Sequence, residues 1–176
     1  MAEEACVRLV ERLRGSELRA KELSSFLSKE IVKDRDLLEG LADDIDLLND
    51  VEKGILLEAI EYATNIDPEV VEPVLEVVFE CLKCEAPKVK WEAARVVGNV
   101  AHLFPDEVSR FVPRLLENTR HRGTVVRWST AFALGEIIKH DMKTRHGLLP
   151  EVEKILKREK NNGVKNVYKK ALKSLQ

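Results

Sequence analysis

Two segments carry one repeated motif: residues 89–98 are Val89-Lys90-Trp91-Glu92-Ala93-Ala94-Arg95-Val96-Val97-Gly98, and residues 126–135 are Val126-Arg127-Trp128-Ser129-Thr130-Ala131-Phe132-Ala133-Leu134-Gly135. The valine, the base, the tryptophan, the small residues, the aliphatic residues and the glycine recur 37 residues apart. A period of this length is typical of stacked repeat proteins, because a single supersecondary unit cannot bury its apolar face alone. The repetition therefore predicts a repeat protein whose stacked units present a binding surface.

The composition is compatible with one helical domain. The chain has 176 residues, of which 44% are apolar, and a chain of this size can bury one core. Charged residues make up 34% and there are only eight glycines and six prolines, which favours helices with short loops over an all-β fold. No apolar run reaches the roughly 18 residues that a membrane-spanning helix needs, and the acidic start does not resemble a secretory signal. We expect a soluble, cytoplasmic protein.

Apolar residues with three-and-four spacing predict paired helices on both sides of the repeated motif. We expect helices over 69–83, 88–104, 107–121, 126–140, 149–160 and 164–175, with a weaker copy of the second helix near residues 52–60. Two further amphipathic segments, residues 5–14 and 18–32, precede them. Pro113 and Pro150 are again 37 residues apart and are expected where a helix starts or bends. We assign residues 1–34 to an N-terminal helical cap and 35–176 to about four helix pairs of the same domain.

The segment from Val126 to Gly135 resembles the second helix of a HEAT repeat, in which the valine, the base, two small residues, an aliphatic residue and a glycine recur as they do here. Residues 35–176 resemble about four HEAT units, most closely in the central two. The resemblance implies an all-α fold, a right-handed α–α superhelix whose second helices line the concave side. Members of the family mostly act as protein-binding scaffolds. A minority bind nucleic acid, including a group of alkylpurine DNA glycosylases.

Helical geometry places one stripe of each second helix away from the packing positions. The stripes consist of Trp91, Arg95, Asn99 and His102 in one helix and of Trp128, Phe132, Glu136 and Lys139 in the next. Exposed aromatic residues beside arginine are typical of interaction hot spots. We predict that Trp91, Arg95, Trp128 and Phe132 contact a protein partner. The alternative is that both indoles pack between successive repeats.

A column of bases also follows the repeat: Lys53, Lys90, Arg127 and Lys165. The HEAT resemblance implies that each base pairs with an acid in the preceding turn, five residues before the valine. Those positions hold Cys84, His121 and Glu159, of which only the last is acidic. Lys90 and Arg127 are therefore predicted to add charge to the partner-binding site, with solvated or locally paired bases as the alternative.

Charge is sorted along the chain, although the net charge is only -2. Residues 36–80 contain 14 acidic residues and one basic residue, whereas residues 110–173 contain 16 basic and six acidic residues. A solenoid turns this order into an acidic end and a basic end, which favours partners with separated charge or weak head-to-tail self-association. In the basic half, Arg120, Arg122 and Lys165 are possible phosphate contacts, together with Arg158 and the lysines of residues 154–173. Nucleic-acid binding is therefore the alternative function.

Catalytic and metal-binding patterns are missing from the sequence. It contains no phosphate-binding glycine loop, nucleophile elbow or zinc-protease motif. Glu92 and Glu136 are the only loose candidates for a glycosylase-like acid. The Cys81-x-x-Cys84 spacing lacks the two further ligands that zinc requires, so Cys81 is expected in the core and Cys84 at a helix end. We predict a non-enzymatic protein with no cofactor and no metal.

Overall fold

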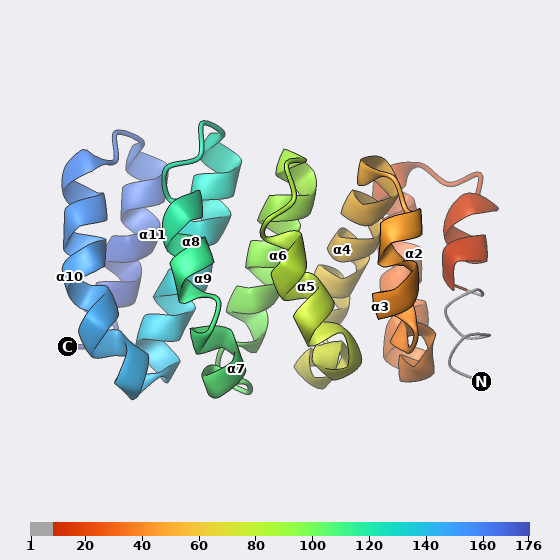
Figure 1. Cartoon of the computed structure of the whole chain (residues 1–176), viewed down its shortest axis with the longest axis horizontal. Coiled ribbons are helices and arrows are strands. Elements are labelled where there is room, and N and C mark those ends of the chain that lie inside the picture. The colour runs from red at the N-terminus through yellow and green to blue at the C-terminus, as the bar shows by residue number, and fades with distance from the viewer. Residues whose placement is uncertain (1–8) are drawn as a thin grey trace.

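The computed structural model describes residues 9–176, and every regular element in this range is a helix. The helices form pairs that stack side by side into a right-handed α–α superhelix with its ends far apart (Figure 1). The all-α solenoid predicted from the sequence is thus confirmed. Within residues 9–176 no helix is long and apolar enough to cross a membrane.

The second helices form one continuous layer. In chain order they are α2 (Ala20–Lys33), α4 (Asp50–Thr64), α6 (Pro87–Val100), α9 (Thr124–His140) and α11 (Asn162–Lys173), and each packs against the next. The starts of α6 and α9 lie 37 residues apart, so the repeat period of the sequence is also the period of the structure. The division at residue 34 stays a prediction; it coincides with Asp34, the residue that ends α2.

The first helices form an outer layer, which lies in front of the second helices in Figure 1. This layer is irregular in its first half. It contains 3₁₀ turns at Arg35–Leu38, Ile45–Leu47 and Pro68–Val74 and the helices α3 (Leu41–Asp44), α5 (Leu75–Cys81), α7 (Pro105–Ser109), α8 (Val112–Asn118) and α10 (Met142–Arg158). A short helical segment at residues 9–14 precedes α2, and the first part of the predicted segment 5–14 lies outside the described residues.

Side-chain caps fix where several helices begin. The Asn49 side chain accepts hydrogen bonds from the backbone of Val51 and Glu52, and Glu52 accepts one in return from the Asn49 backbone at 2.9 Å. This reciprocal capping box satisfies backbone donors that the first turn of α4 leaves free. Asp141 caps α10 in a similar way through Lys143 and Thr144.

The expected outer helices need three corrections. Of the helix predicted over 69–83 only Leu75–Cys81 is α-helical, because the first half is the 3₁₀ turn Pro68–Val74, which contains Pro73. The helix predicted over 107–121 is interrupted between α7 and α8, and Pro113 lies in the first turn of α8, as expected for a helix start. The helix predicted from residue 149 begins at Met142 instead, because Asp141 caps it there. Pro150 therefore lies inside α10, where its exposed position tolerates the missing backbone donor.

The core follows the predicted packing positions. The valines and alanine expected to be buried in α6 are at most 1% exposed, and so are Val126, Thr130, Ala133, Leu134 and Ile137 of α9. At Gly98 the helices α6 and α9 come so close that a Cβ atom would lie 2.4 Å from the Phe132 ring. The glycine of the repeated motif is thus required by the close approach of the next repeat.

Gly98→Ala and Gly147→Ala are expected to change stability in opposite directions. The first places a methyl group against Phe132 and should lower the free energy of unfolding by about 1–3 kcal/mol, since overpacking forces neighbouring groups to shift. Gly147 lies inside α10 with nothing within 4 Å of its virtual Cβ, so alanine there should add about 0.5–1 kcal/mol through helix propensity. Urea denaturation measures both. Equal effects of the two variants would contradict the close contact at Gly98.

Candidate binding surface

The predicted stripe lies on the solvent-accessible side of the second-helix layer. Trp128 on α9 is 42% exposed, and its ring stacks on that of Phe132 with 6.3 Å between centroids and 13° between planes. Trp91 on α6 is half-buried, and the Arg95 side chain is 35% exposed. The structure therefore brings these four residues onto neighbouring helices of one face.

Phe132 links this face to the core. One edge of its ring fills the space above Gly98 of α6, while Trp128 lies on the ring one turn away. Packing between repeats, which was the alternative for the two indoles, is instead seen for Phe132. Trp128 is supported by that packing and is left exposed, which is how an aromatic side chain gains contact area with little loss of conformational entropy.

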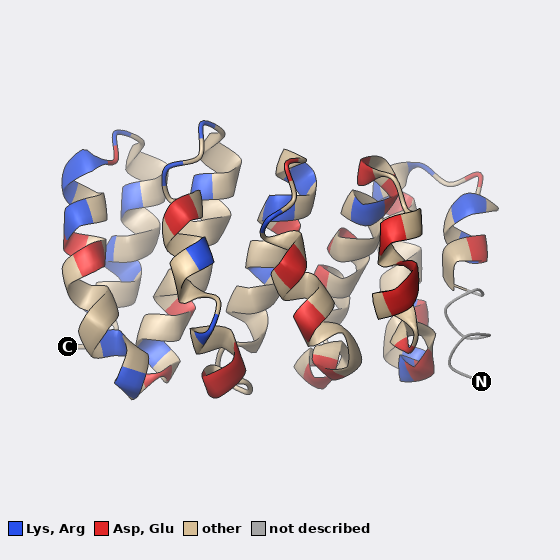
Figure 2. Cartoon of the chain, viewed as in Figure 1, with Lys and Arg blue, Asp and Glu red and all other residues tan. Residues whose placement is uncertain are grey.

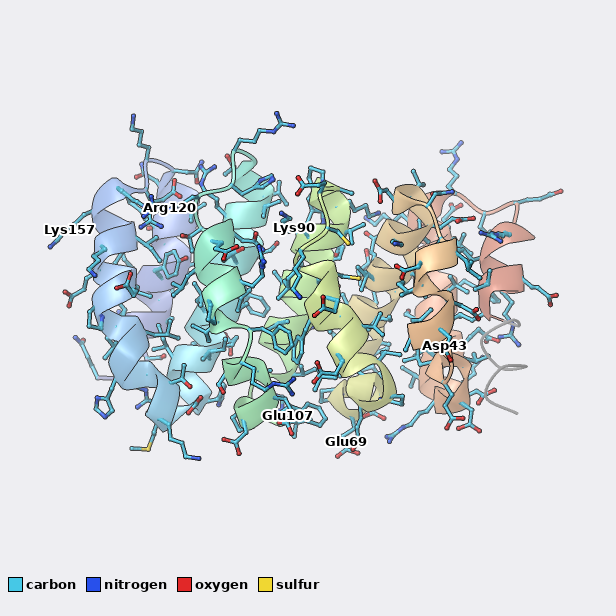
Figure 3. The ribbon with its side chains drawn as sticks, viewed as in Figure 1. Asp43, Glu69, Lys90, Glu107, Arg120 and Lys157 are labelled. Atoms are coloured by element: carbon cyan, nitrogen blue, oxygen red, sulfur yellow. The ribbon has the colours of Figure 1, made fainter. Side chains whose placement is uncertain are left out.

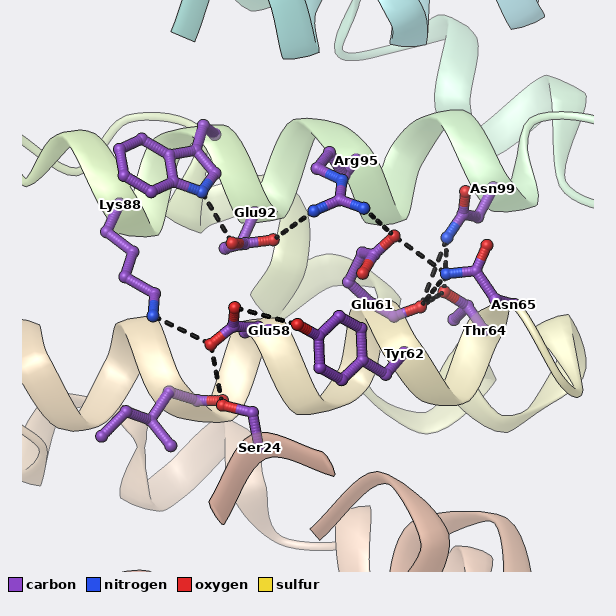
Figure 4. Close-up of polar contacts among 12 residues, drawn as sticks. Ser24, Glu58, Glu61, Tyr62, Thr64, Asn65, Lys88, Glu92, Arg95 and Asn99 are labelled. Carbon is purple, nitrogen blue, oxygen red and sulfur yellow. Dashed lines mark hydrogen bonds and ion pairs between the residues drawn. The ribbon is translucent and has the colours of Figure 1, made fainter. Parts of the chain in front are cut away.

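A chain of polar contacts joins α4 to α6 beside the aromatic residues (Figure 4). Trp91 Nε1 donates to Glu92 Oε1 at 2.6 Å. The Arg95 guanidinium lies 2.8 Å from Glu61 Oε1 and 3.6 Å from Glu92 Oε2, so it bridges the two carboxylates. Glu61 and Glu92 are each only 2% exposed. Arg95, predicted as a partner contact, is therefore held in place by two buried acids.

A second, separate group of polar contacts between α4 and α6 lies near the start of α6 (Figure 4). Lys88 Nζ lies 2.9 Å from Glu58 Oε2, and the Tyr62 hydroxyl donates to Glu58 Oε1 at 3.2 Å. At the other end Asn99 donates to Thr64 Oγ1 at 2.9 Å. Sequence reasoning did not identify Glu58, Glu61, Tyr62 or Lys88. The α4 copy of the motif is too degenerate to align these acids with the stripe of α6.

The surroundings shift the pKa of Glu92 and that of Glu58 in opposite directions. Loss of solvent contact raises the pKa of Glu92, and the Trp91 and Arg95 interactions only partly offset it. Burial acts on Glu58 in the same direction, but hydrogen bonds from Lys88 and Ser24 outweigh it and lower the pKa of Glu58. Among the described residues, Glu61 Oε2 and Glu92 Oε2 have no hydrogen-bond donor. The centre of the surface thus contains two buried carboxyl groups, each with one oxygen that accepts no hydrogen bond from the described residues.

Of the two bases predicted to add charge, Arg127 is paired within the chain and Lys90 is buried. Arg127 Nε lies 2.8 Å from Glu159 Oε2, and its Nη1 donates to the backbone carbonyls of His121 and Arg122. Burial disfavours the charged form of Glu159, but hydrogen bonds from Arg127 and the Asn161 amide outweigh it and lower its pKa. Lys90 is only 8% exposed. Arg127 is thus locally paired, which was the alternative stated for this column of bases. The acid that pairs with it, Glu159, belongs to the following repeat.

The basic half of the chain forms a separate feature. Arg120 and Arg122 line a hollow of about 390 Å³ between the α8–α9 turn and the α10–α11 turn, where Arg158 and Lys160 join them. Lys165, the third predicted phosphate contact, does not line this hollow. Figure 2 shows Lys and Arg concentrated over α8 to α11 and Asp and Glu over α3 to α7, the separation that the sequence predicts.

The cysteines take the expected positions. Cys81 is the last residue of α5 and is buried, and burial together with the neighbouring Cys84 raises the pKa of its thiol to about 12. Cys84 lies in the turn that follows and is partly exposed. Cys6 lies outside the described residues. Within residues 9–176, no three side chains of the types that ligate metals are grouped for a metal ion.

Comparison with known proteins supports the fold. No family model and no curated protein matches the chain. Among solved structures, computationally designed armadillo repeat proteins for modular peptide recognition match with a TM-score of 0.66 at 17% identity, over 94% of this chain and 80% of theirs. Two engineered proteins match with TM-scores of 0.65 and 0.66 at 17% and 23% identity, over 94% and 96% of this chain and 76% and 79% of theirs. At these identities the likeness shows a helical repeat solenoid.

Glu92→Gln and Glu58→Gln are expected to change stability with opposite pH dependence. A raised pKa means that wild-type Glu92 contributes most below its unfolded value of about 4.5 and loses that contribution as pH rises through the folded value. As the pH rises from 4 to 7.5, the free energy of unfolding of Glu92→Gln should therefore increase relative to that of wild type. Glu58 has a lowered pKa, so its contribution is present above about 4.5 and is lost as pH falls through its folded value.

Glu58→Gln should accordingly lose stability at pH 7.5, and this loss should shrink towards acidic pH. Thermal unfolding of the three proteins in a buffer series gives the comparison. If the stability of both variants changed with pH in the same way, the opposite pKa shifts assigned to Glu92 and Glu58 would be wrong.

Arg127→Lys is expected to lower the free energy of unfolding by about 1–3 kcal/mol, because an ammonium cannot keep the two-pronged contact with Glu159 together with both carbonyls. Arg122→Lys, five residues away and exposed, is the matched control and should stay within about 0.5 kcal/mol of wild type. Chemical denaturation measures the difference. If Arg127→Lys left the free energy of unfolding unchanged, the contacts of Arg127 with Glu159 and the two carbonyls would not stabilise the fold.

Proposed function

We propose that this chain is a non-enzymatic scaffold of the HEAT type in the cytoplasm, which holds an extended segment of a protein partner along its second helices. The observation that carries the proposal is the exposed Trp128, supported from below by Phe132 and Gly98. Rigid aromatic side chains at the surface are the residues that dominate binding energy in protein interfaces.

The repeat geometry suits an extended partner. A segment lying across α4, α6 and α9 would meet Tyr62, then Trp91 with Arg95, then Trp128 with Phe132, one group for each repeat. Arg95 and Asn99 add hydrogen-bond donors whose positions are fixed by Glu61 and Thr64. The likeness to designed armadillo repeat proteins for modular peptide recognition supports this use of the fold. In the proposal the second helices line the concave side.

The acids that a glycosylase-like role would need are already engaged. Glu92 is 2% exposed and interacts with Trp91 and Arg95, so its carboxylate has no access to a substrate. Glu136 lies 2.6 Å from Lys139 and 3.5 Å from His140. These contacts favour a scaffold over an enzyme, because a general acid must reach the substrate atom that it protonates.

Trp128→Ala is expected to abolish enrichment when a displayed library of random peptides is selected on the purified protein. Truncating a central aromatic anchor costs about 2 kcal/mol or more of binding energy, which is at least roughly 30-fold in affinity. Sequencing of the selected pools measures the enrichment, and titration of the best peptides measures the affinity.

Met142→Ala is the matched control, since Met142 is an exposed apolar residue of α10 in the outer layer. This variant should select the same peptides as the wild type. Selection that survives Trp128→Ala, in a variant whose circular dichroism is unchanged, would remove the aromatic stripe as the binding site.

A further inference from the structure

The hollow at the basic end combines side chains from two successive repeats. Thr119, Arg120, His121 and Arg122 follow the end of α8. Arg158, the last residue of α10, and Glu159 and Lys160 after it come 36 to 41 residues later. Figure 3 labels Arg120 between α8 and α10. Because the repeat places equivalent turns side by side, this grouping is a product of the stacking.

Most of the cations in the hollow have no partner among the described residues. Arg120, Arg122 and Lys160 make no ion pair and no side-chain hydrogen bond with any of residues 9–176, and Arg158 donates only to Thr119 Oγ1. The single acid of the hollow, Glu159, is 8% exposed and is neutralised by Arg127. Four positive charges therefore remain around one hollow.

The acids next to the hollow have their nearest cations outside it. Glu117 and Glu151 line an adjoining depression with Arg120 and Arg158. Glu117 pairs with Arg114, and Glu151 lies 2.7 Å from Lys154. The hydrogen bond from Lys154 lowers the pKa of Glu151, and the charges of Arg158 and Arg120 also contribute to lowering it. His121 adds one more donor, because its Nδ1 accepts the Gly123 amide at 2.9 Å and Nε2 is left to carry the proton.

We propose that this hollow binds the phosphate group of a phosphorylated side chain in the protein partner. The planar guanidinium groups of Arg120, Arg122 and Arg158 match phosphate oxygens in pairs, and a phosphorylated serine or threonine brings close to two negative charges. This inference rests on the proposed function, because the phosphorylated residue belongs to the segment held by the second helices. The hollow and Trp128 both adjoin the first half of α9.

A single phosphate fits the charge distribution better than a nucleic acid does. A polynucleotide needs a row of cations that follows its backbone. Here the cations are concentrated at α8 to α11, and the outer surface beyond them carries exposed acids such as Asp43, Glu69 and Glu107 (Figures 2 and 3). A compact group of arginines is the arrangement that recognises one phosphorylated residue.

The anion site is tested first with inorganic phosphate alone. We expect saturable shifts of the backbone amide NMR signals of residues 119–123 and 158–161, in buffers whose ionic strength is held constant with sodium chloride. The double variant Arg122→Gln with Arg158→Gln should bind phosphate at least about tenfold more weakly, since two charge-assisted contacts are lost. The double variant Lys143→Gln with Lys173→Gln removes the same charge elsewhere and should bind like wild type.

The occupant is tested with three probes: a degenerate peptide library with a central phosphoserine, the same library with serine, and a 15-residue single-stranded oligothymidylate. We expect the phosphoserine library to bind at least about tenfold more tightly than the serine library, and the arginine double variant to abolish the difference. Tighter binding of the oligonucleotide through the same arginines would overturn the phosphoprotein occupant.

The results separate this inference from the scaffold function. Normal random-peptide selection without saturable phosphate shifts would overturn the anion site and leave the scaffold standing. Failure of peptide selection while inorganic phosphate still binds would overturn the scaffold and, with it, the phosphorylated occupant. Circular dichroism of each variant checks that it stays folded, so that a loss of phosphate binding can be attributed to the site. All four substituted side chains are exposed, and we expect the spectra to be unchanged.

Discussion

The close contact between α6 and α9 is the interaction on which the rest of the molecule depends. It is made possible by Gly98, whose missing side chain leaves the space that the Phe132 ring occupies. Phe132 in turn supports Trp128 at the surface. One glycine therefore allows two repeats to stack and also determines where an aromatic side chain meets solvent. The packing of the two repeats and the exposure of Trp128 thus depend on the same residue, so a substitution of Gly98 would affect both.

The neighbouring contact, between α4 and α6, is built on charge. Glu61 and Glu92 are buried with one guanidinium between them, and each keeps an oxygen without a hydrogen-bond donor among the described residues. Taking carboxylates out of water costs free energy, and apolar residues of similar volume would often stack with equal or better stability. The two buried carboxylates hold the Trp91 and Arg95 side chains in defined positions. This is consistent with a surface that presents fixed polar groups.

The sequence predicted the second helices and their buried faces well, because both follow from a local period that survives in the residues themselves. It did not predict Glu58 and Glu61, which meet α6 across 30 to 38 residues from a repeat whose motif has diverged. The outer helices were also harder to place. Pro113 lies at the start of a helix, whereas Pro150 lies inside one, because Asp141 caps that helix nine residues earlier. The prolines alone do not distinguish the two cases. The pairing of Arg127 with Glu159 requires knowing which repeat supplies the acid.

Five of the six prolines lie in the outer layer, and the sixth, Pro87, is the first residue of α6. Pro68, Pro105 and Pro113 lie at the start of helical segments and Pro73 lies inside a 3₁₀ turn, so the outer layer before α10 consists of short segments, whereas the second helices are continuous. The second helices α4, α6 and α9 start 37 residues apart and are unbroken, so the surface built on them repeats regularly although the outer layer does not.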